Sequence, residues 1–149
     1  MKEFNVADFR AHFPILDRTV HGKPLVYLDN AATAQKPQCV IDTVNMLHSE
    51  LNANIHRGVH FLAEECTSRY EAARKCVGQM LGTDLREEVV FTSGATASLN
   101  LAAWSLSEMC IREGDNVVVS EMEHHSNLVP WQEMCRRRGA QLRMLPMDD

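Results

Sequence analysis

The chain has 149 residues, of which 45% are hydrophobic and 23% are charged, and its formal net charge is -5 at pH 7. This composition is typical of one ordinary globular domain, and the negative charge argues against nucleic acid as a partner. No apolar run approaches the roughly eighteen residues that a membrane helix needs, and the N-terminus lacks a signal-peptide core. We therefore expect a cytoplasmic protein with no membrane partner.

The first part of the sequence predicts short elements. Residues 5–13 carry a helical pattern that ends at Pro14, residues 17–24 are a polar connection that can form a hairpin, and residues 25–28 are a predicted strand. Residues 29–37 follow as a loop of small side chains, which let backbone approach a ligand or a neighbouring subunit closely. The alternative is a simple turn before a helix that starts with proline at its first position.

Two longer helices are predicted next. Apolar residues recur at helical spacing from Val40 to Leu51, which predicts a helix with one buried face. Residues 61–81 carry the second pattern, and Gly82 follows as a helix stop.

The loop between these helices contains His56 and His60, four residues apart. That spacing can hold a metal ion when both histidines lie on a helix. Arg57 and Gly58 disfavour such a helix, and no carboxylate lies between the two histidines. We therefore expect no metal site.

The remaining sequence alternates between strand and helix patterns. Residues 88–92, 116–120 and 141–145 are predicted strands, and residues 97–110 and 128–138 are the predicted helices between them. Strands joined by helical crossovers of about 10–15 residues pair in parallel. The sequence therefore predicts an α/β fold with a mainly parallel sheet and flanking helices.

All five cysteines fall within helical patterns, and none forms a C-x-x-C pair. We expect small, reduced core residues rather than a disulfide set or a zinc site. They are Cys39, Cys66, Cys76, Cys110 and Cys135.

A turn of small residues, Thr-Ser-Gly-Ala-Thr at 92–96, joins a predicted strand to a predicted helix. Backbone N–H groups at the positive end of the helix, helped by the hydroxyls of Ser93 and Thr96, are suited to bind a phosphate. The Walker A and G-x-G-x-x-G patterns are both missing, which argues against a nucleotide. The alternative is that Ser93 or Thr96 only caps the helix.

His124 and His125 follow the next predicted strand, at the sheet edge where α/β proteins bind ligands. An imidazole there can stack on a planar ring, donate a hydrogen bond or titrate near neutrality. Together with the preceding phosphate turn, the pair would hold the two ends of a phosphorylated aromatic cofactor. Pyridoxal 5′-phosphate (PLP) fits, with its phosphate at residues 93–96 and its pyridine ring against His124.

Four segments of the chain resemble the cysteine desulfurases, and most closely the branch that serves the sulfur-mobilisation (SUF) route of iron–sulfur cluster assembly. They are LVYLDNAATAQKP at 25–37, NIHRGVH at 54–60, VFTSGAT at 90–96 and EMEHHSNLVPW at 121–131. These enzymes belong to the class V aminotransferases and share the large-domain fold of type I PLP enzymes. The resemblance implies PLP as cofactor, L-cysteine as substrate, a homodimer and a sulfur-acceptor protein as partner.

The resemblance also implies roles for individual residues. His124 matches the histidine that stacks on the pyridine ring and can take part in proton transfer, and Ala95 and Thr96 match the pair that holds the phosphate. The family commonly has two threonines followed by glutamate, so the alanines at 95 and 97 imply a weaker phosphate site. Four further residues match family segments that approach the substrate at the mouth of the site. They are Ala31, Ala32, His56 and Arg57.

In these enzymes the Schiff-base lysine, the aspartate on the pyridine nitrogen, the sulfur-accepting cysteine and the carboxylate-binding arginine lie later than the sequence matched here. We therefore expect residues 1–149 to be an N-terminal segment plus the first part of the PLP-binding large domain, inactive alone. The complete enzyme would convert cysteine to alanine and leave a persulfide on its own cysteine. Alternatives are another class V enzyme, such as a selenocysteine lyase or a kynureninase-like hydrolase, and a non-catalytic relic or interaction module.

Overall fold

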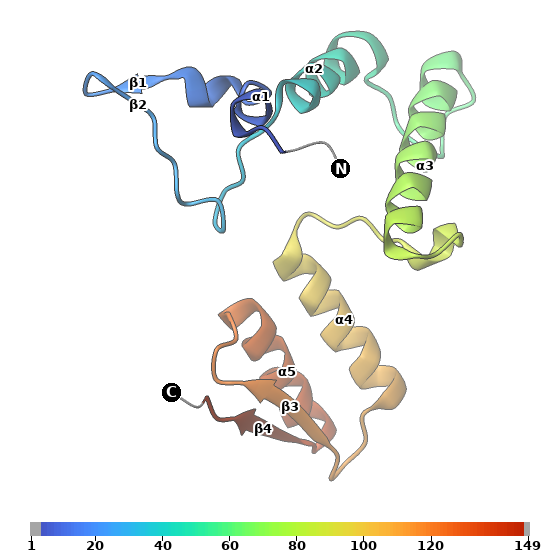
Figure 1. The fold of residues 1–149 in the computed structure, drawn as a ribbon. Helices are drawn as coiled ribbons and strands as arrows, with labels where there is room; N and C mark the ends of the chain where they lie inside the picture. The colour runs from blue at the N-terminus through green and yellow to red at the C-terminus, as the bar shows by residue number, and fades with distance from the viewer. Residues whose placement is uncertain (1–3, 148–149) are drawn as a thin grey trace. The chain divides into compact units, whose positions relative to one another are not determined.

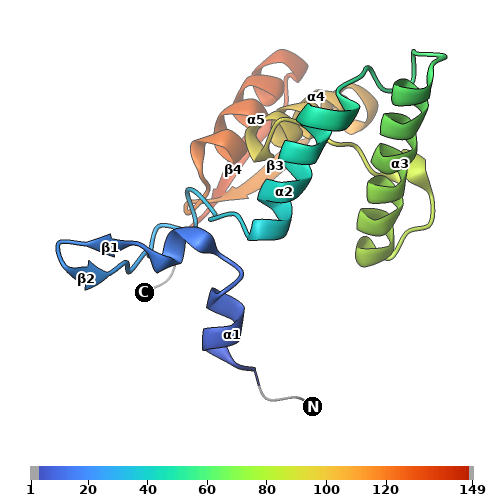
Figure 2. The same cartoon turned by 90° about the horizontal axis from the view of Figure 1, so that it is seen from above.

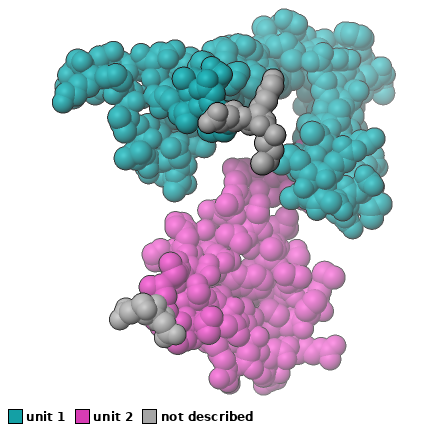
Figure 3. Space-filling model, viewed as in Figure 1, with its two compact units in different colours: residues 1–88 teal, residues 89–149 magenta. Residues whose placement is uncertain are grey.

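The structure is a computed structural model that describes residues 4–147. The chain divides into two compact units, unit 1 at Met1–Glu88 and unit 2 at Val89–Asp149, and each is described by itself (Figure 3). Among the described residues, no helix combines the length and the apolar character needed to cross a membrane.

Unit 1 is built mainly from helices and one small hairpin (Figures 1 and 2). In chain order its elements are α1 (Val6–Arg10), the 3-10 helix η1 (Pro14–Asp17), β1 (Thr19–Val20), β2 (Lys23–Pro24), α2 (Gln38–Met46), the π-helical turn η2 (Leu47–Leu51), α3 (Phe61–Leu81) and the 3-10 helix η3 (Arg86–Glu88).

The first helix is shorter than the prediction of residues 5–13. The side chain of Asn5 caps α1 by accepting from the N–H groups of Ala7 and Asp8, but the helix ends at Arg10. Pro14 opens η1 instead, and the residue before it, Phe13, is extended because the proline ring disfavours helical backbone there.

The predicted hairpin is confirmed, whereas the predicted strand at residues 25–28 is wrong. β1 and β2 pair in antiparallel fashion around His21 and Gly22, whose φ values of 52° and 75° suit a tight hairpin turn. Leu25 N–H still donates to Arg18 O at 2.9 Å. In the part of the chain that the structure describes, no strand pairs with residues 26–28.

The core of unit 1 lies where η2 meets α3. Leu51, Ala63 and Cys66 are buried, and the thiol of Cys66 donates to Leu51 O. α3 has the predicted bounds, beginning after His60, whose Nδ1 accepts from Ala63 N–H, and ending at Gly82 with φ 82°. A left-handed glycine is the usual end of a helix because it bears no Cβ.

Unit 2 contains one strand–helix–strand motif, and another helix packs against the helix of that motif (Figure 1). Its elements are α4 (Ala95–Cys110), β3 (Asn116–Ser120), α5 (His125–Arg138) and β4 (Gln141–Leu145). β3 and β4 are parallel, in register from Asn116 opposite Gln141 to Ser120 opposite Leu145. The core between sheet and helices contains Ala103, Ser107, Val119, Met134 and Cys135. The predicted α/β class and parallel pairing are confirmed.

The predicted strand at residues 88–92 is wrong. Glu88 ends η3, and residues 89–92 belong to neither a helix nor a strand. The described parallel sheet therefore has two strands rather than three. Val89 is buried but Val90 is exposed, so the apolar run reflects partial burial and not membership of a ladder.

The prediction of five core cysteines holds for two of them. Cys66 and Cys135 are buried, whereas Cys39, Cys76 and Cys110 are exposed. Helical spacing identifies an apolar face but not whether another element covers it. Burial raises the pKa of the Cys135 thiol, which keeps it protonated and unreactive.

The start of α3 has no room for a side chain at residue 58. A Cβ on Gly58 would lie 2.3 Å from the Cβ of Ala63, which is fully buried. Gly58→Ala should therefore lower the free energy of unfolding by about 1–3 kcal/mol through overpacking. Ala63→Gly removes the clashing atom, so the double variant should be more stable than the sum of the single effects predicts. Additive effects in denaturant unfolding would contradict this close approach.

Candidate functional site

The phosphate turn predicted at residues 92–96 is the start of α4. Gly94 is the residue before the helix, with φ 151° and ψ 176°, a conformation that side chains rarely adopt. No described side chain caps α4, and its first turn carries no acidic residue. Ala95 and Thr96, the first two residues of the helix, thus lie at a positive end that no side chain neutralises.

The hydroxyl of Thr92 stabilises this turn through contacts with the backbone of Gly94 and the hydroxyl of Ser98. Thr92 Oγ1 donates to Gly94 O at 3.0 Å, accepts from Gly94 N–H at 3.4 Å and lies 2.6 Å from Ser98 Oγ. The alternative in which Ser93 or Thr96 caps the helix is therefore not what the structure shows. Sequence reasoning did not assign this role to Thr92, because a threonine two residues before a glycine does not by itself indicate a brace.

His124 occupies the corresponding position at the start of α5. Its Nδ1 accepts from the backbone N–H of Ser126 at 3.1 Å and lies 2.8 Å from Ser126 Oγ. A backbone N–H can only donate, so the neutral ring carries its proton on Nε2. The ring is exposed and meets the ring of His125 edge to face, with 6.2 Å between centroids.

The structure brings these two helix starts to the same end of unit 2. α4 and α5 pack against each other, and β3 leads into α5 at the end where α4 also begins (Figure 1). Ala95, Thr96 and His124 therefore lie at one edge of this unit. The arrangement places an uncapped helix start and an exposed imidazole on neighbouring elements.

The sequence reasoning missed a chain of side-chain hydrogen bonds beside His124. Glu123 accepts from Ser120 Oγ and from Asn127 Nδ2, both at 2.8 Å, and Asn127 Oδ1 accepts from Trp131 Nε1 at 3.1 Å. These donors hold the pKa of Glu123 below its usual range, the Asn127 amide first and the Ser120 hydroxyl second. A signal for this network was present in the sequence. Glu123, Asn127 and Trp131 are four residues apart, the spacing at which side chains on a helix can interact.

Ala31 and Ala32, predicted near the substrate, lie in a turn of unit 1. Both are exposed, and Thr33 N–H donates to Asp29 O at 3.1 Å across the turn. The hydroxyl of Tyr27 lies 3.0 Å from Asp29 O and 2.9 Å from Thr33 O, which holds the turn closed.

His56 and Arg57, also predicted near the substrate, lie in the turn before α3. His56 has φ 62°, a conformation that costs a non-glycine residue on the order of 1 kcal/mol. Its N–H donates to Thr67 Oγ1 at 3.0 Å, and its Nε2 lies 3.2 Å from Glu71 Oε1. These bonds from α3 hold the turn, while Arg57 is exposed.

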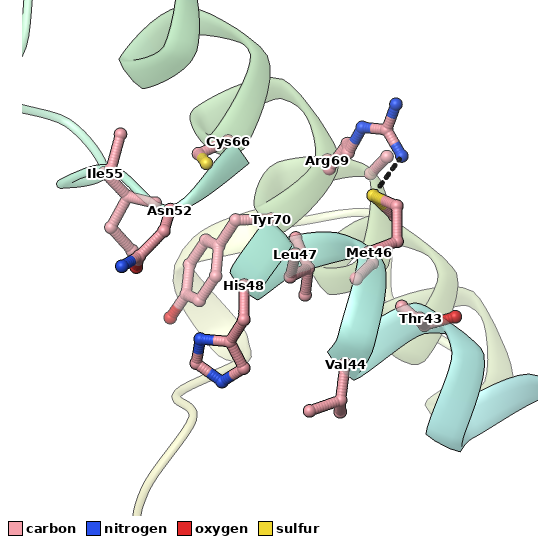
Figure 4. Close-up of a pocket in the computed structure, with 13 residues that line it drawn as sticks. Thr43, Val44, Met46, Leu47, His48, Asn52, Ile55, Cys66, Arg69 and Tyr70 are labelled. Carbon is pink, nitrogen blue, oxygen red and sulfur yellow. Dashed lines mark hydrogen bonds between the residues drawn. The ribbon is translucent and has the colours of Figure 1, made fainter. Parts of the chain in front are cut away.

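A separate hollow of about 650 Å³ lies in unit 1 between η2 and α3 (Figure 4). Its lining is mostly apolar, with Tyr70 and Cys66 on α3 and Leu47 and His48 on η2. None of the sequence-predicted site residues lines it, so it is not the predicted cofactor site. Within the described residues, no three His, Cys, Asp or Glu side chains gather as a metal site.

Comparison with known proteins identifies the family. Residues 26–149 match the family described as aminotransferase class-V. The chain belongs to the class V aminotransferase family. A relative named as a probable cysteine desulfurase, from Vibrio cholerae serotype O1, is 48% identical over 143 residues, which cover 96% of this chain and 35% of that protein.

Two solved structures of cysteine desulfurases are also similar to this chain. The apo structure of a cysteine desulfurase from Thermococcus onnurineus has a TM-score of 0.86 and 34% identity and covers 99% of this chain and 35% of its own. The Escherichia coli cysteine desulfurase CsdA, in an S-sulfonic acid form, has a TM-score of 0.77 and 38% identity, with 99% and 36% coverage. The chain thus spans about a third of the length of these relatives.

The turn at His56 depends on one hydroxyl of α3. Thr67→Val keeps the side-chain shape but removes the acceptor for His56 N–H, so it should cost about 1–2 kcal/mol and speed amide exchange at His56. Thr43→Val is a matched control, because Thr43 Oγ1 donates only to Cys39 O within its own helix. Equal exchange at His56 in both variants would show that Thr67 does not hold the turn.

Proposed function

We propose that the protein carrying this chain is a PLP-dependent cysteine desulfurase, in which the starts of α4 and α5 hold the cofactor. The single observation that carries the proposal is the uncapped, acid-free first turn of α4 at the same end of unit 2 as the exposed imidazole of His124. Membership of the class V family and 48% identity to a named probable cysteine desulfurase support the same reaction.

The residues at these two helix starts fit PLP. A phosphate is an acceptor with negative charge, and the first turn of α4 offers backbone N–H groups, a positive helix end and the hydroxyl of Thr96. Gly94 leaves the approach open, since a Cβ built there meets no atom within 4 Å. The aromatic ring of the cofactor is planar, and the imidazole of His124 is a planar partner for it.

The residues of this chain are assigned two tasks, which are to position the cofactor and to transfer protons beside it. Bound PLP supplies an electron sink for bonds at the Cα of an amino acid. The imidazole of His124 would lie against the pyridine ring, and its neutral form carries the proton on Nε2, which suits it to donate or return a proton beside the ring. The Thr96 hydroxyl and the N–H of Ala95 would bind the phosphate and so fix the position of the ring.

On the substrate side, we assign L-cysteine to the turns that carry Ala31, Ala32, His56 and Arg57. The methyl side chains of the two alanines leave space for a small amino acid, and Arg57 is an exposed cation. The turn at His56 is held by Thr67 and Glu71, so these residues present a fixed backbone rather than a loose loop.

The wider role follows from the reaction. The products are alanine and a persulfide on the enzyme's own cysteine, and that sulfur passes to an acceptor protein of SUF-type iron–sulfur cluster assembly. The protein is proposed to act as a cytoplasmic homodimer. Residues 1–149 alone are proposed to be inactive, because in the enzymes that they resemble the lysine that holds the cofactor and the cysteine that accepts the sulfur lie later than the matched sequence.

The role of His124 is tested by comparing two adjacent histidines. In the cofactor-free full-length protein, His124→Ala should weaken PLP binding roughly five- to tenfold, because an aromatic stack contributes about 1 kcal/mol beyond buried area. His125→Ala is the control and should bind PLP as the unchanged protein does. Equal PLP affinity of all three proteins, measured by titration, would remove His124 from the site.

The phosphate turn is tested at two neighbouring positions. Ala95→Thr adds a hydroxyl beside the phosphate and should raise PLP affinity by about fivefold, the value of one neutral hydrogen bond. Gly94→Val should lower it sharply, because valine is strained at φ 151° and not because the turn is crowded. Pyridoxal without its phosphate is the control ligand and should not distinguish Ala95→Thr from the unchanged protein. An identical response to both ligands would place the phosphate elsewhere.

A further inference from the structure

The side chains of Glu123, Asn127 and Trp131 form one directed chain of hydrogen bonds at the start of α5. The indole N–H of Trp131 can only donate, so Asn127 turns its oxygen toward Trp131 and its amide NH₂ toward Glu123. Glu123 then accepts on both oxygens, from Asn127 and from the Ser120 hydroxyl at the end of β3. Two donors directed at the two carboxyl oxygens favour the ionised form of Glu123.

This network of hydrogen bonds joins residues that precede and follow His124 in the sequence. Glu123 precedes it and is tied to β3, while Asn127 follows it by three residues and also donates its backbone N–H to His124 O at 2.8 Å. All four side chains of the network are half-buried, whereas the His124 ring is exposed. The strand end and the second turn of α5 are thus joined across the residue that carries the imidazole.

The network does not touch the His124 ring, so its effect on the ring would pass through the first turn of α5. The His124 ring is held directly by Ser126, whose position depends on the first turn of α5. Loss of the Asn127 bonds frees that turn and with it the hydrogen bond from Ser126 N–H to Nδ1. The ring would then lose both its fixed orientation and its preference for a proton on Nε2.

We propose that Glu123, Asn127 and Trp131 are positioning residues that set the orientation and tautomer of His124. The link to cofactor binding rests on the function proposed above, whereas the link to the His124 ring does not. The experiment therefore reads the ring and the cofactor separately.

Trp131→Phe is the principal variant, because it keeps an aromatic ring and removes only the N–H donor and part of the ring area. Trp104→Phe is the matched control, since Trp104 is the chain's other tryptophan and meets Arg137 rather than this network. Asn127→Asp is the second variant, because it replaces the donor to Glu123 by a carboxylate and breaks the chain at its centre.

The first readout is the pair of ring ¹⁵N shifts of His124 in cofactor-free, histidine-labelled full-length protein. In Trp131→Phe and Asn127→Asp, we expect a shift away from the single Nε2–H tautomer and about fivefold faster exchange of the Ser126 amide. Trp104→Phe should leave both unchanged. A purely structural brace predicts a lower melting temperature with unchanged ring shifts, and that result in both network variants would overturn the proposal.

The second readout is the visible circular dichroism of bound PLP, which reports how the ring is held. The network variants should reduce this signal at saturating PLP, and Trp104→Phe should not. If the ring shifts move but His124→Ala binds PLP normally, the proposed cofactor contact of His124 fails while the positioning role stands. If the shifts stay fixed but His124→Ala loses affinity, the positioning role fails while the cofactor contact stands.

Discussion

The candidate site depends on the first turn of α4, which no described side chain caps. A helix start carries a partial positive charge of about half an elementary unit, and its N–H groups need acceptors. Most helices supply an acceptor from serine, threonine, aspartate or asparagine, but here Gly94 occupies that position and the first turn has no acid. This first turn is therefore suited to an anionic ligand, as the proposed phosphate site requires.

The strand–helix–strand arrangement of unit 2 supplies the rest of the site. β3 and β4 are parallel, so β3 leads into α5 at the end of the unit where α4 also begins. This connection places His124 at the same end of unit 2 as the first turn of α4, although His124 lies 28 positions after Thr96. The hydrogen bonds of Glu123, Asn127 and Trp131 then link the end of β3 to the first two turns of α5.

Sequence patterns predicted the elements that depend on local signals. β3, β4 and α3 have the predicted bounds, because apolar periodicity and Gly82 act within a few residues. Residues 25–28 and 88–92 were predicted as strands and are not, because a strand needs a neighbour that periodicity does not reveal. The Thr92 brace and the Glu123 network depend on side-chain directions, which only coordinates supply.

The central claim is that one phosphorylated ring joins the start of α4 to the start of α5. A crystal structure of the full-length protein with PLP tests it most directly. The account predicts phosphate oxygens within hydrogen-bond distance of the N–H groups of Ala95 and Thr96, with the pyridine ring against the imidazole of His124. A phosphate bound away from Gly94–Thr96, or a ring that does not contact His124, would contradict it.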